Sequence, residues 1–247
     1  MVRLIQHLVE APRACSYLSN ETASLEHRIM LDVEPAMLEA MLSRGWRRFG
    51  PDYFRPACNP CEACVPTRII TAEFVLTRSQ RRARSRADKL RIEVGPPRVD
   101  EERLALYHAW HKNREIAREW ASGELSGRDY FYQFSFPHPS AREIAYYDEE
   151  AEKLIAIGIS DETPNAWSAI YCFYDPAYAR FSPGLVNVIT NVAIARAQGK
   201  PHMYLGYRVS DCPSLRYKSD FHPQEVLVGR PGEDEQPQWV RQNPSGE

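Results

Sequence analysis

Hydrophobic and polar positions follow helical spacing in two parts of the first half of the chain. Residues 34–45, EPAMLEAMLSRG, place their apolar side chains on one helical face, and Gly45 suits the end of a helix. Residues 100–120 carry acids in a first turn and predict a longer helix. Between them, residues 67–77 are rich in β-branched side chains, which predicts a strand.

The second half of the chain reads as strands interrupted by one long helix. Residues 182–201 predict a helix that begins near Pro183 and is stopped by Gly199 and Pro201. Apolar runs predict the strands, which lie at 142–147, 152–161, 166–176, 202–209 and 225–229. This order of strands around a helix predicts a mixed α/β (α+β) fold.

The segment GPPRV, residues 95–99, has the composition of a linker. We therefore expect an N-terminal domain over residues 1–95 and a second domain over residues 96–230. The remaining residues, 231–247, are acidic and rich in proline without periodicity, which predicts a flexible tail.

Composition indicates a globular chain. Of its 247 residues, 43% are hydrophobic and 26% are charged, enough to bury a core and stay in solution. No run approaches the roughly 18 apolar residues that cross a bilayer, and the N-terminus lacks the features of a signal peptide. We expect a cytoplasmic protein that does not contact membranes.

The net charge of −2 argues against a general nucleic-acid binder, but the charge is unevenly distributed. Residues 78–91 hold one acid among many bases, and a helix there would present ridges of charge suited to phosphates. The alternative is an ordinary solvated helix face. The arginines of this run that we consider for RNA contacts are Arg78, Arg81, Arg82, Arg84 and Arg86.

A second basic stretch, RGWRRFGPDYF, places Arg44, Arg47 and Arg48 among aromatic side chains. Aromatic rings interleaved with arginine stack on exposed RNA bases. The same stretch also fits the edge of a core with a charged rim.

Three cysteines in CNPCEACVP, Cys58, Cys61 and Cys64, stand at two consecutive CxxC spacings. This spacing lets neighbouring thiolates reach one ion, so zinc or an iron–sulfur cluster are candidates, with Cys15 as a fourth ligand. The alternatives are a redox switch and free thiols.

Polar residues follow the strands of the second half. Asp161 and Asp175 are candidates for a general base that acts on an amine, and each also fits a turn or cap. Arg216 and Lys218 could hold an acidic substrate or pair with surface acids.

Taken together, several stretches resemble the aminoacyl-tRNA–protein transferases, which include eukaryotic arginyltransferases and bacterial aspartate/glutamate leucyltransferases. The resemblance covers about residues 13–228. The stretches that carry it, in family order, are CSYLS, RGWRRFGPDYFRPAC, CEACVPTRI, LTRSQRR, LIAIGISD, IYCFYDPAY and YLGYRVSDCPSLRYKSDF.

The resemblance implies a GNAT-like acyltransferase domain and a smaller N-terminal domain that contains the cysteines. It implies transfer of an amino acid from charged tRNA to the α-amine of proteins beginning with Asp or Glu, which marks them for degradation in the N-degron pathway. Such aminolysis of an ester needs a deprotonated amine and no covalent enzyme intermediate, so we expect that no cofactor is required for the chemistry.

By position, the resemblance implies a base or amine-positioning role for Asp161 and a place in the active-site pocket for Tyr207. It also implies that the acceptor pocket and the predicted helix at 100–120 contribute substrate-binding residues, namely Arg216, Tyr217, Lys218, Tyr107 and Arg114. Cys15, Cys61 and Cys64 match family cysteines that some members use for metal or iron–sulfur binding, and Cys58 belongs to the bacterial-type spacing. The basic run from Arg78 to Arg86 is the expected tRNA contact.

Two departures bear on the substrates. Glu115 stands where the family pattern has His, and the spaced glycines of a GNAT pyrophosphate loop are missing, which disfavours coenzyme A. Arginine and leucine both remain open as the transferred residue. Two rival hypotheses are a GNAT-like N-acyltransferase with another acyl donor and a non-catalytic RNA-binding or metal-sensing module.

Overall fold

The computed structural model describes residues 1–118 and 125–242. A small antiparallel sheet is formed near the N-terminus, with the strand order β1-β4-β6-β5. Its strands are β1 (Arg3–Val9), β4 (Leu25–Leu31), β6 (Asp52–Pro56) and β5 (Arg47–Phe49). Helix α1 (Pro35–Ser43) packs its apolar side against this sheet, and a short hairpin, β2 (Arg13–Ala14) with β3 (Thr22–Ala23), precedes β4.

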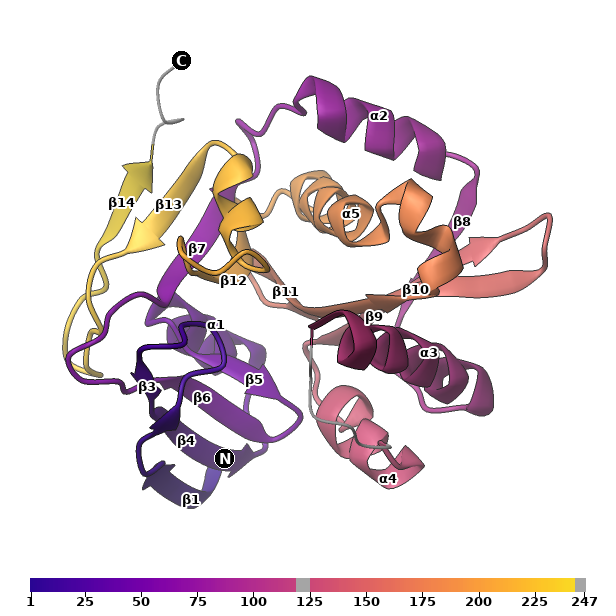
Figure 1. The fold of residues 1–247 in the computed structure, drawn as a ribbon. Coiled ribbons are helices and arrows are strands. Elements are labelled where there is room, and N and C mark those ends of the chain that lie inside the picture. Colours follow the sequence, from indigo (N-terminus) through magenta and orange to yellow (C-terminus); the bar gives the residue numbers. More distant parts are fainter. Residues whose placement is uncertain (119–124, 243–247) are drawn as a thin grey trace.

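An eight-stranded sheet forms the centre of the molecule, with the order β14-β13-β7-β12-β11-β10-β9-β8 (Figure 1). Its strands are β14 (Trp239–Gln242), β13 (Gln224–Leu227), β7 (Val65–Ile70), β12 (His202–Arg208), β11 (Ala166–Tyr174), β10 (Lys153–Glu162), β9 (Ala141–Asp148) and β8 (Leu90–Gly95). The mixed α/β fold expected from the sequence is confirmed.

Helices cover both faces of this sheet (Figure 1). Helices α5 (Pro183–Ala197) and α2 (Arg78–Ala87) lie on one face, and α3 (Glu101–Arg118) and α4 (Gly127–Tyr130) lie on the other. Each face has its own apolar cluster, because successive side chains of a strand point to opposite faces. Short helical turns complete the chain: η1 (Phe131–Ser135), η2 (Pro176–Phe181) and η3 (Arg216–Asp220).

Strands β11 and β12 are the one parallel pair among the strand pairings of the described residues, and they part after a short contact. The parallel register joins Ala166–His202, Trp167–Met203 and Ser168–Tyr204. Beyond Ser168 and Tyr204 both strands continue without pairing to each other. The parting of two adjacent strands leaves room for side chains from other elements.

Pairing in the large sheet crosses the boundary expected near Gly95. Strand β7 pairs with β12 and β13, and β8 pairs with β9, so residues before the linker complete the sheet of the second half. A strand's partner depends on long-range pairing, which a local change of composition does not encode.

The C-terminal segment also differs from the expected flexible tail. Strand β14 pairs with β13, the Trp239 indole donates to the Ser43 carbonyl at 3.1 Å, and its ring lies under the Arg68 guanidinium at 4.3 Å. Residues 243–247 lie outside the described residues. Within the described ranges, no helix combines the length and the hydropathy that a membrane crossing requires.

Candidate active site

Lys218 and Arg47 bring two cations to the place where β11 and β12 part. Lys218 comes from η3, and Arg47 comes from β5 of the small sheet. A Cβ built on Gly206 of β12 would lie 3.3 Å from the Lys218 Nζ and 3.6 Å from the Arg47 Cζ. Both cationic groups therefore border the space that glycine leaves open.

The Arg47 guanidinium is buried, with 8% of the residue exposed. It donates to the Ser168 hydroxyl at 2.8 Å and to the Ala169 carbonyl, both on β11 where that strand leaves β12. Burial lowers the pKa of Arg47, but an arginine side chain keeps its charge in a protein. A permanent positive charge is thus fixed in the opening by neutral acceptors.

The Lys218 ammonium lies in a similar environment. Burial, followed by the nearby charge of Arg47, lowers its pKa to about 7, while Cys64 and Cys212 act in the opposite direction. Lys218 can therefore lose its proton near neutral pH, and an anion beside it would favour the charged form.

Asp161, at the end of β10, is bound to Arg48 of β5. The Arg48 Nε lies 3.1 and 3.0 Å from the two carboxylate oxygens, and an Nη also donates to Oδ1. The two side chains are 1% and 4% exposed. The carboxylate expected to face an amine thus has a buried arginine as its immediate partner.

His138 and Tyr53 lie next to this ion pair, and their charges are suppressed by burial. Burial, together with the charge of Arg48, lowers the pKa of His138 to about 4. Burial raises the pKa of Tyr53 well above its ordinary value. Both side chains are neutral at pH 7, so Arg48 and Asp161 hold the charges of this cluster.

Tyr207 reaches from β12 to the small sheet. Its hydroxyl donates to the Gly45 carbonyl at 2.8 Å and lies 3.4 Å from the Phe54 carbonyl. Burial raises its pKa far above the ordinary value, so the hydroxyl stays protonated. In this geometry Tyr207 fixes the turn before β5, two residues from Arg47.

Arg216 and Tyr217 point away from the Lys218 side of η3. Both are exposed, and they line an open hollow of about 360 Å³ together with Ser219 and Asp220. Of the two cations that the sequence offered for an acidic ligand, the structure places Lys218 in the strand opening and Arg216 at the surface.

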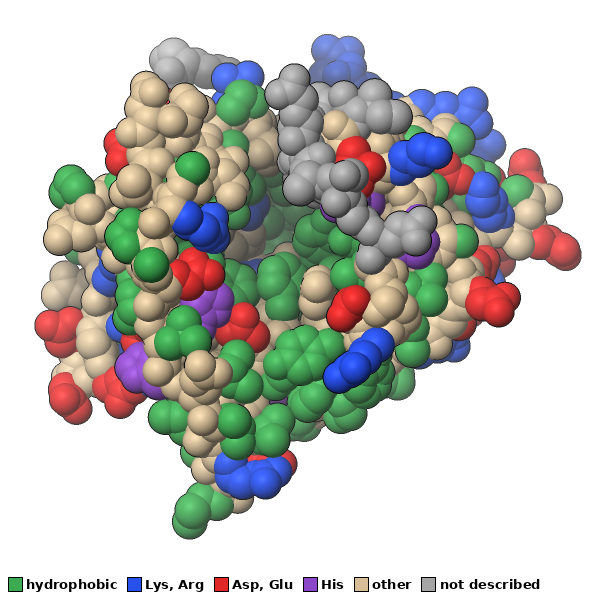
Figure 2. Space-filling model, turned by 60° about the horizontal axis from the view of Figure 1, so that its bottom comes forward, with side chains coloured by type: hydrophobic (Ala, Val, Ile, Leu, Met, Phe, Trp, Pro, Cys, Tyr) green, Lys and Arg blue, Asp and Glu red, His purple; other side chains and the backbone are tan. Residues whose placement is uncertain are grey.

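The other predicted substrate residues, on α3, lie elsewhere. Tyr107 packs against Phe173 at 5.5 Å between ring centroids, and burial raises its pKa to about 12. Arg114 lies over the Trp110 ring at 4.0 Å. Tyr107 and Trp110 belong to the apolar cluster on the α3 side of the sheet, and Arg114 lies at it through Trp110. The molecular surface is hollowed between the small-sheet side and the α3–α4 side (Figure 2).

Asp175, the other candidate base, caps η2. Its carboxylate accepts from the Ala177 N–H at 2.9 Å and from the Lys153 ammonium at 2.6 Å. Asp175 therefore occupies a cap position, which was the alternative to a role as general base.

The basic run forms α2, as expected. Thr77 and Gln80 make a capping box at its start, and Gln80, Ala83 and Ala87 are buried where α2 packs against α5. The opposite side faces solvent, and the exposed arginines on it are Arg78, Arg81, Arg82, Arg84 and Arg86. Arg47 and Arg48, by contrast, are buried. For these two residues the stretch RGWRRFG forms the edge of a core and is not an exposed surface for RNA.

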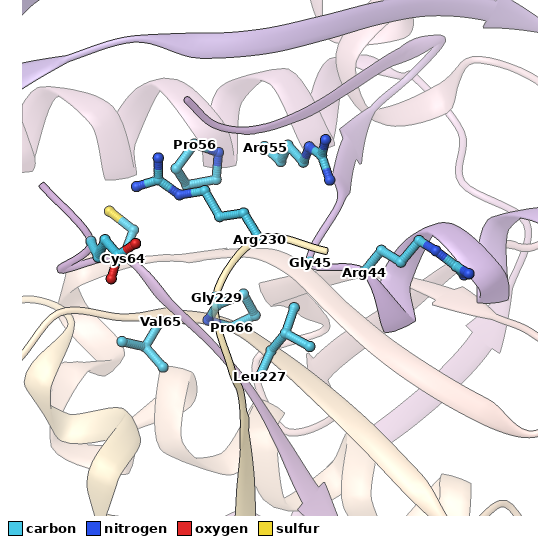
Figure 3. Close-up of a pocket in the computed structure, with 11 residues that line it drawn as sticks. Arg44, Gly45, Arg55, Pro56, Cys64, Val65, Pro66, Leu227, Gly229 and Arg230 are labelled. Atoms are coloured by element: carbon cyan, nitrogen blue, oxygen red, sulfur yellow. The ribbon is translucent and has the colours of Figure 1, made fainter. Parts of the chain in front are cut away.

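The four clustered cysteines share one region of the small-sheet side. Burial raises the pKa of the Cys64 thiol to about 12, and the nearby Cys58, Cys15 and Cys61 add to this rise. Arg230 donates to the carbonyls of Cys58 and Cys61 and thereby holds the loop against the C-terminal segment. A cavity of about 130 Å³ lies beside Cys64, with Arg230 extending along it and Arg44 at its far side (Figure 3).

The thiols of the four cysteines lie near one another, as the CxxC spacing predicts for residues that could bind a metal ion. In the part of the chain that the structure describes, no three or more His, Cys, Asp or Glu side chains converge on a point that could hold one. The four cysteines form no disulfide with one another.

The sequence indicates Arg47 and Arg48 as RNA-stacking residues or as part of a core edge with a charged rim, and it does not indicate them, Gly206 or His138 as parts of this site. The available signal was RR within an aromatic stretch, which does not distinguish a buried pair from an exposed one. The partner of Arg48 lies 113 residues away.

Comparisons with known proteins agree with the sequence resemblance. The family model for the arginine-tRNA-protein transferase N terminus matches residues 13–82, and the model for the C terminus matches residues 102–228. An aspartate/glutamate leucyltransferase of Pseudomonas fluorescens is 34% identical over 240 residues, 94% of each chain. One of Campylobacter jejuni is 33% identical over 217 residues, which cover 87% of this chain and 90% of the relative.

Among solved structures, L-PGS from Bacillus licheniformis aligns with a TM-score of 0.43 and 13% identity, over 59% of this chain and 47% of that one. The assignment rests on the family models and the leucyltransferase relatives, which span nearly the whole chain. The chain belongs to the arginine-tRNA-protein transferase family of aminoacyltransferases.

Proposed function

We propose that this protein transfers leucine from leucyl-tRNA to the α-amine of proteins that begin with Asp or Glu. The relatives named aspartate/glutamate leucyltransferase support this donor and these acceptors. The observation that carries the proposal is the Lys218 ammonium in the opening between β11 and β12, because an acidic side chain needs a cation where the amine is acylated. The product would enter the N-degron pathway in the cytoplasm, where charged tRNA is available.

The GNAT-like character of the catalytic half is part of this proposal. It is supported by a parallel strand pair that parts after three residue pairs, with α5 connecting the two strands. Backbone N–H groups of strands that part in this way are the donors that we propose for the oxyanion of the tetrahedral intermediate.

The reaction is aminolysis of the aminoacyl ester. The acceptor amine forms a C–N bond to the ester carbonyl carbon, the C–O bond to the terminal ribose breaks, and the amine proton ends on the leaving oxygen. This balance needs no cofactor and no covalent enzyme intermediate. A positioned amine and a stabilised oxyanion provide most of the acceleration in such reactions.

We propose positioning roles for Asp161 and Tyr207. Asp161 fixes β5 through Arg48, and Tyr207 fixes the same strand through the Gly45 carbonyl. The family resemblance implies that Asp161 acts as a base or positions the amine, and both roles require contact with the amine. A buried carboxylate paired with Arg48 agrees better with positioning of the strand.

The arginine face of α2 is the proposed contact for the tRNA backbone. Its five exposed arginines face solvent, and α2 is held on the body by its contact with α5. Phosphate contacts of this kind make binding strongly dependent on salt.

Zinc or an iron–sulfur cluster at Cys15, Cys58, Cys61 and Cys64 stays a prediction, and we route no step of the reaction through it. Metal analysis and an absorption spectrum of anaerobically purified protein test this prediction directly. One zinc per chain, or about two or four irons with an equal amount of sulfide, would support it, and metal-free protein with full activity would contradict it.

The proposed function is tested by incubating the protein with leucyl- or arginyl-tRNA and peptides that begin with Asp, Glu, Asn or Gln. We expect leucine on the Asp and Glu peptides and little transfer to the amides. Transfer of arginine alone would overturn the donor, and absence of transfer from both tRNAs would overturn the function.

A further inference from the structure

We infer that Arg47, together with Lys218, binds the carboxylate of the acceptor's first side chain, and that Arg47 is the main determinant of specificity for acidic residues. This inference rests on the proposed function, because it names the residue that reads the acceptor in the same site.

Arg47 is a buried charge that forms no ion pair with any of the described residues. Its hydrogen bonds within the described residues go to a hydroxyl and a carbonyl. The carboxylate whose charge acts on Arg47 is that of Asp161, and it is bound by Arg48. Buried charges in proteins are normally paired, since an unpaired one loses its hydration without compensation. Other buried arginines of this chain follow that rule, and Arg103 is bound by Glu143 at 2.6 Å.

A second cation, the Lys218 ammonium, lies close to Arg47. The Lys218 Nζ and the Arg47 Cζ lie on the same side of Gly206. They are 3.3 and 3.6 Å from the position that a Cβ would take there. Two like charges in a region of low dielectric repel one another. Arg47 is one cause of the low pKa of Lys218. A carboxylate between them would offset this repulsion and restore the charge of Lys218.

The Arg47 guanidinium is held in place by the protein itself, before any ligand binds. Arg47 and Arg48 are neighbours on β5 and point to opposite sides, as alternate residues of a strand do. Arg48 is held by Asp161 of β10, and Arg47 is held by Ser168 of β11, so the strand is tied to the large sheet on both sides. The planar fork has five N–H donors, and those not used by Ser168 and Ala169 are available for a carboxylate.

The test compares kcat/KM for two peptides that differ only in a first residue of Asp or Asn, with leucyl-tRNA as donor. Arg47→Met should lower kcat/KM for the Asp peptide about 100-fold, mainly through KM, because one partner of a buried charged contact is lost. The Asn peptide should change by less than about 3-fold, so the preference for Asp over Asn collapses. Lys218→Met should lower the same preference by a smaller factor.

Arg44→Met is the matched control. Arg44 also ties distant segments, by donating to the Gly232 and Glu233 carbonyls, but it lies outside the strand opening. It should leave the ratio of the two peptides unchanged. If Arg47 only ties the two sheets together, Arg47→Met will weaken both peptides equally, which overturns the inference.

A second variant keeps the test decisive if Arg47→Met does not fold. Arg47→Lys retains the charge and removes the planar fork, and a reduced Asp/Asn ratio supports the inference while an unchanged ratio overturns it. Failure of the proposed function and failure of the Arg47 assignment give different results. If the wild-type protein transfers nothing, the proposed function fails, whereas transfer with an Arg47 variant that keeps its preference defeats the Arg47 assignment alone.

Discussion

Replacement of Asp161 by Asn should destabilise the protein because it removes one partner of a buried ion pair. The Asp161 and Arg48 side chains are 1% and 4% exposed, and the contact is bidentate. Asn has the same size but no charge, so Arg48 would remain buried without an anion. Breaking such a pair costs about 3–5 kcal/mol in the free energy of unfolding. For a chain of this length, that corresponds to a melting temperature lowered by roughly 6–20 °C.

Scanning calorimetry and leucyl-transfer kinetics on the same preparations measure this effect. Glu143→Gln is the matched control, because Glu143 pairs with the buried Arg103 on the α3 side of the sheet. Both variants should melt earlier, and only Asp161→Asn should raise KM for the acceptor peptide. An Asp161→Asn protein that melts within about 2 °C of wild type would refute the structural role of the pair.

A double replacement separates positioning from base catalysis. Asp161→Leu with Arg48→Met removes both charges, and apolar replacement of a whole buried pair is often neutral for stability. If Asp161 positions β5, the double variant should recover stability and part of its activity. A stable double variant without measurable transfer would instead identify Asp161 as the base.

Three further predictions concern charge. The kcat/KM for Asp peptides should fall as pH rises through about 7, since Lys218 loses its proton there next to Arg47, Cys64 and Cys212. Lys218→Arg should remove this loss at alkaline pH. A pH profile that Lys218→Arg leaves unchanged would contradict the assignment. The low pKa of His138 should make the protein less stable as pH falls from about 6.5 to 4, because only the unfolded chain then takes up the proton. The loss in the free energy of unfolding should reach up to about 3 kcal/mol. Chemical denaturation of His138→Gln should show a flatter pH dependence. Replacing Arg81, Arg82 and Arg84 by Gln should weaken tRNA binding and reduce the slope of log affinity against log salt by up to about 2–3, whereas three ion-paired surface arginines, such as Arg3, Arg13 and Arg98, should leave it unchanged.

Elements with a continuous apolar run or a strong helical pattern could be predicted from the sequence. The strand at 152–161 is nearly coincident with β10, which is buried on both faces, and the helix expected near Pro183 begins there as α5. The small sheet could not be predicted in this way. Strand β1 is exposed along its length, and a bulge between Leu4 and Gln6 interrupts its alternation.

The residues of the candidate site also differ in whether the sequence could predict them. Lys218 could be proposed from its basic motif and Tyr207 from the family resemblance, and the structure places Lys218 next to β12, which carries Tyr207. Arg47 could not be identified as a site residue, because its burial depends on β11 and η3, which follow it by more than a hundred positions. The role of Asp161 depends equally on Arg48, so the sequence could indicate the carboxylate but not its partner.

The most direct test of this account is a crystal structure of the protein with a peptide that begins with Asp. We predict that the side-chain carboxylate lies within hydrogen-bonding distance of both the Arg47 guanidinium and the Lys218 ammonium, in the space beside Gly206. A carboxylate bound at Arg216 on the outer side of η3, with Arg47 and Lys218 left without it, would contradict the central claim.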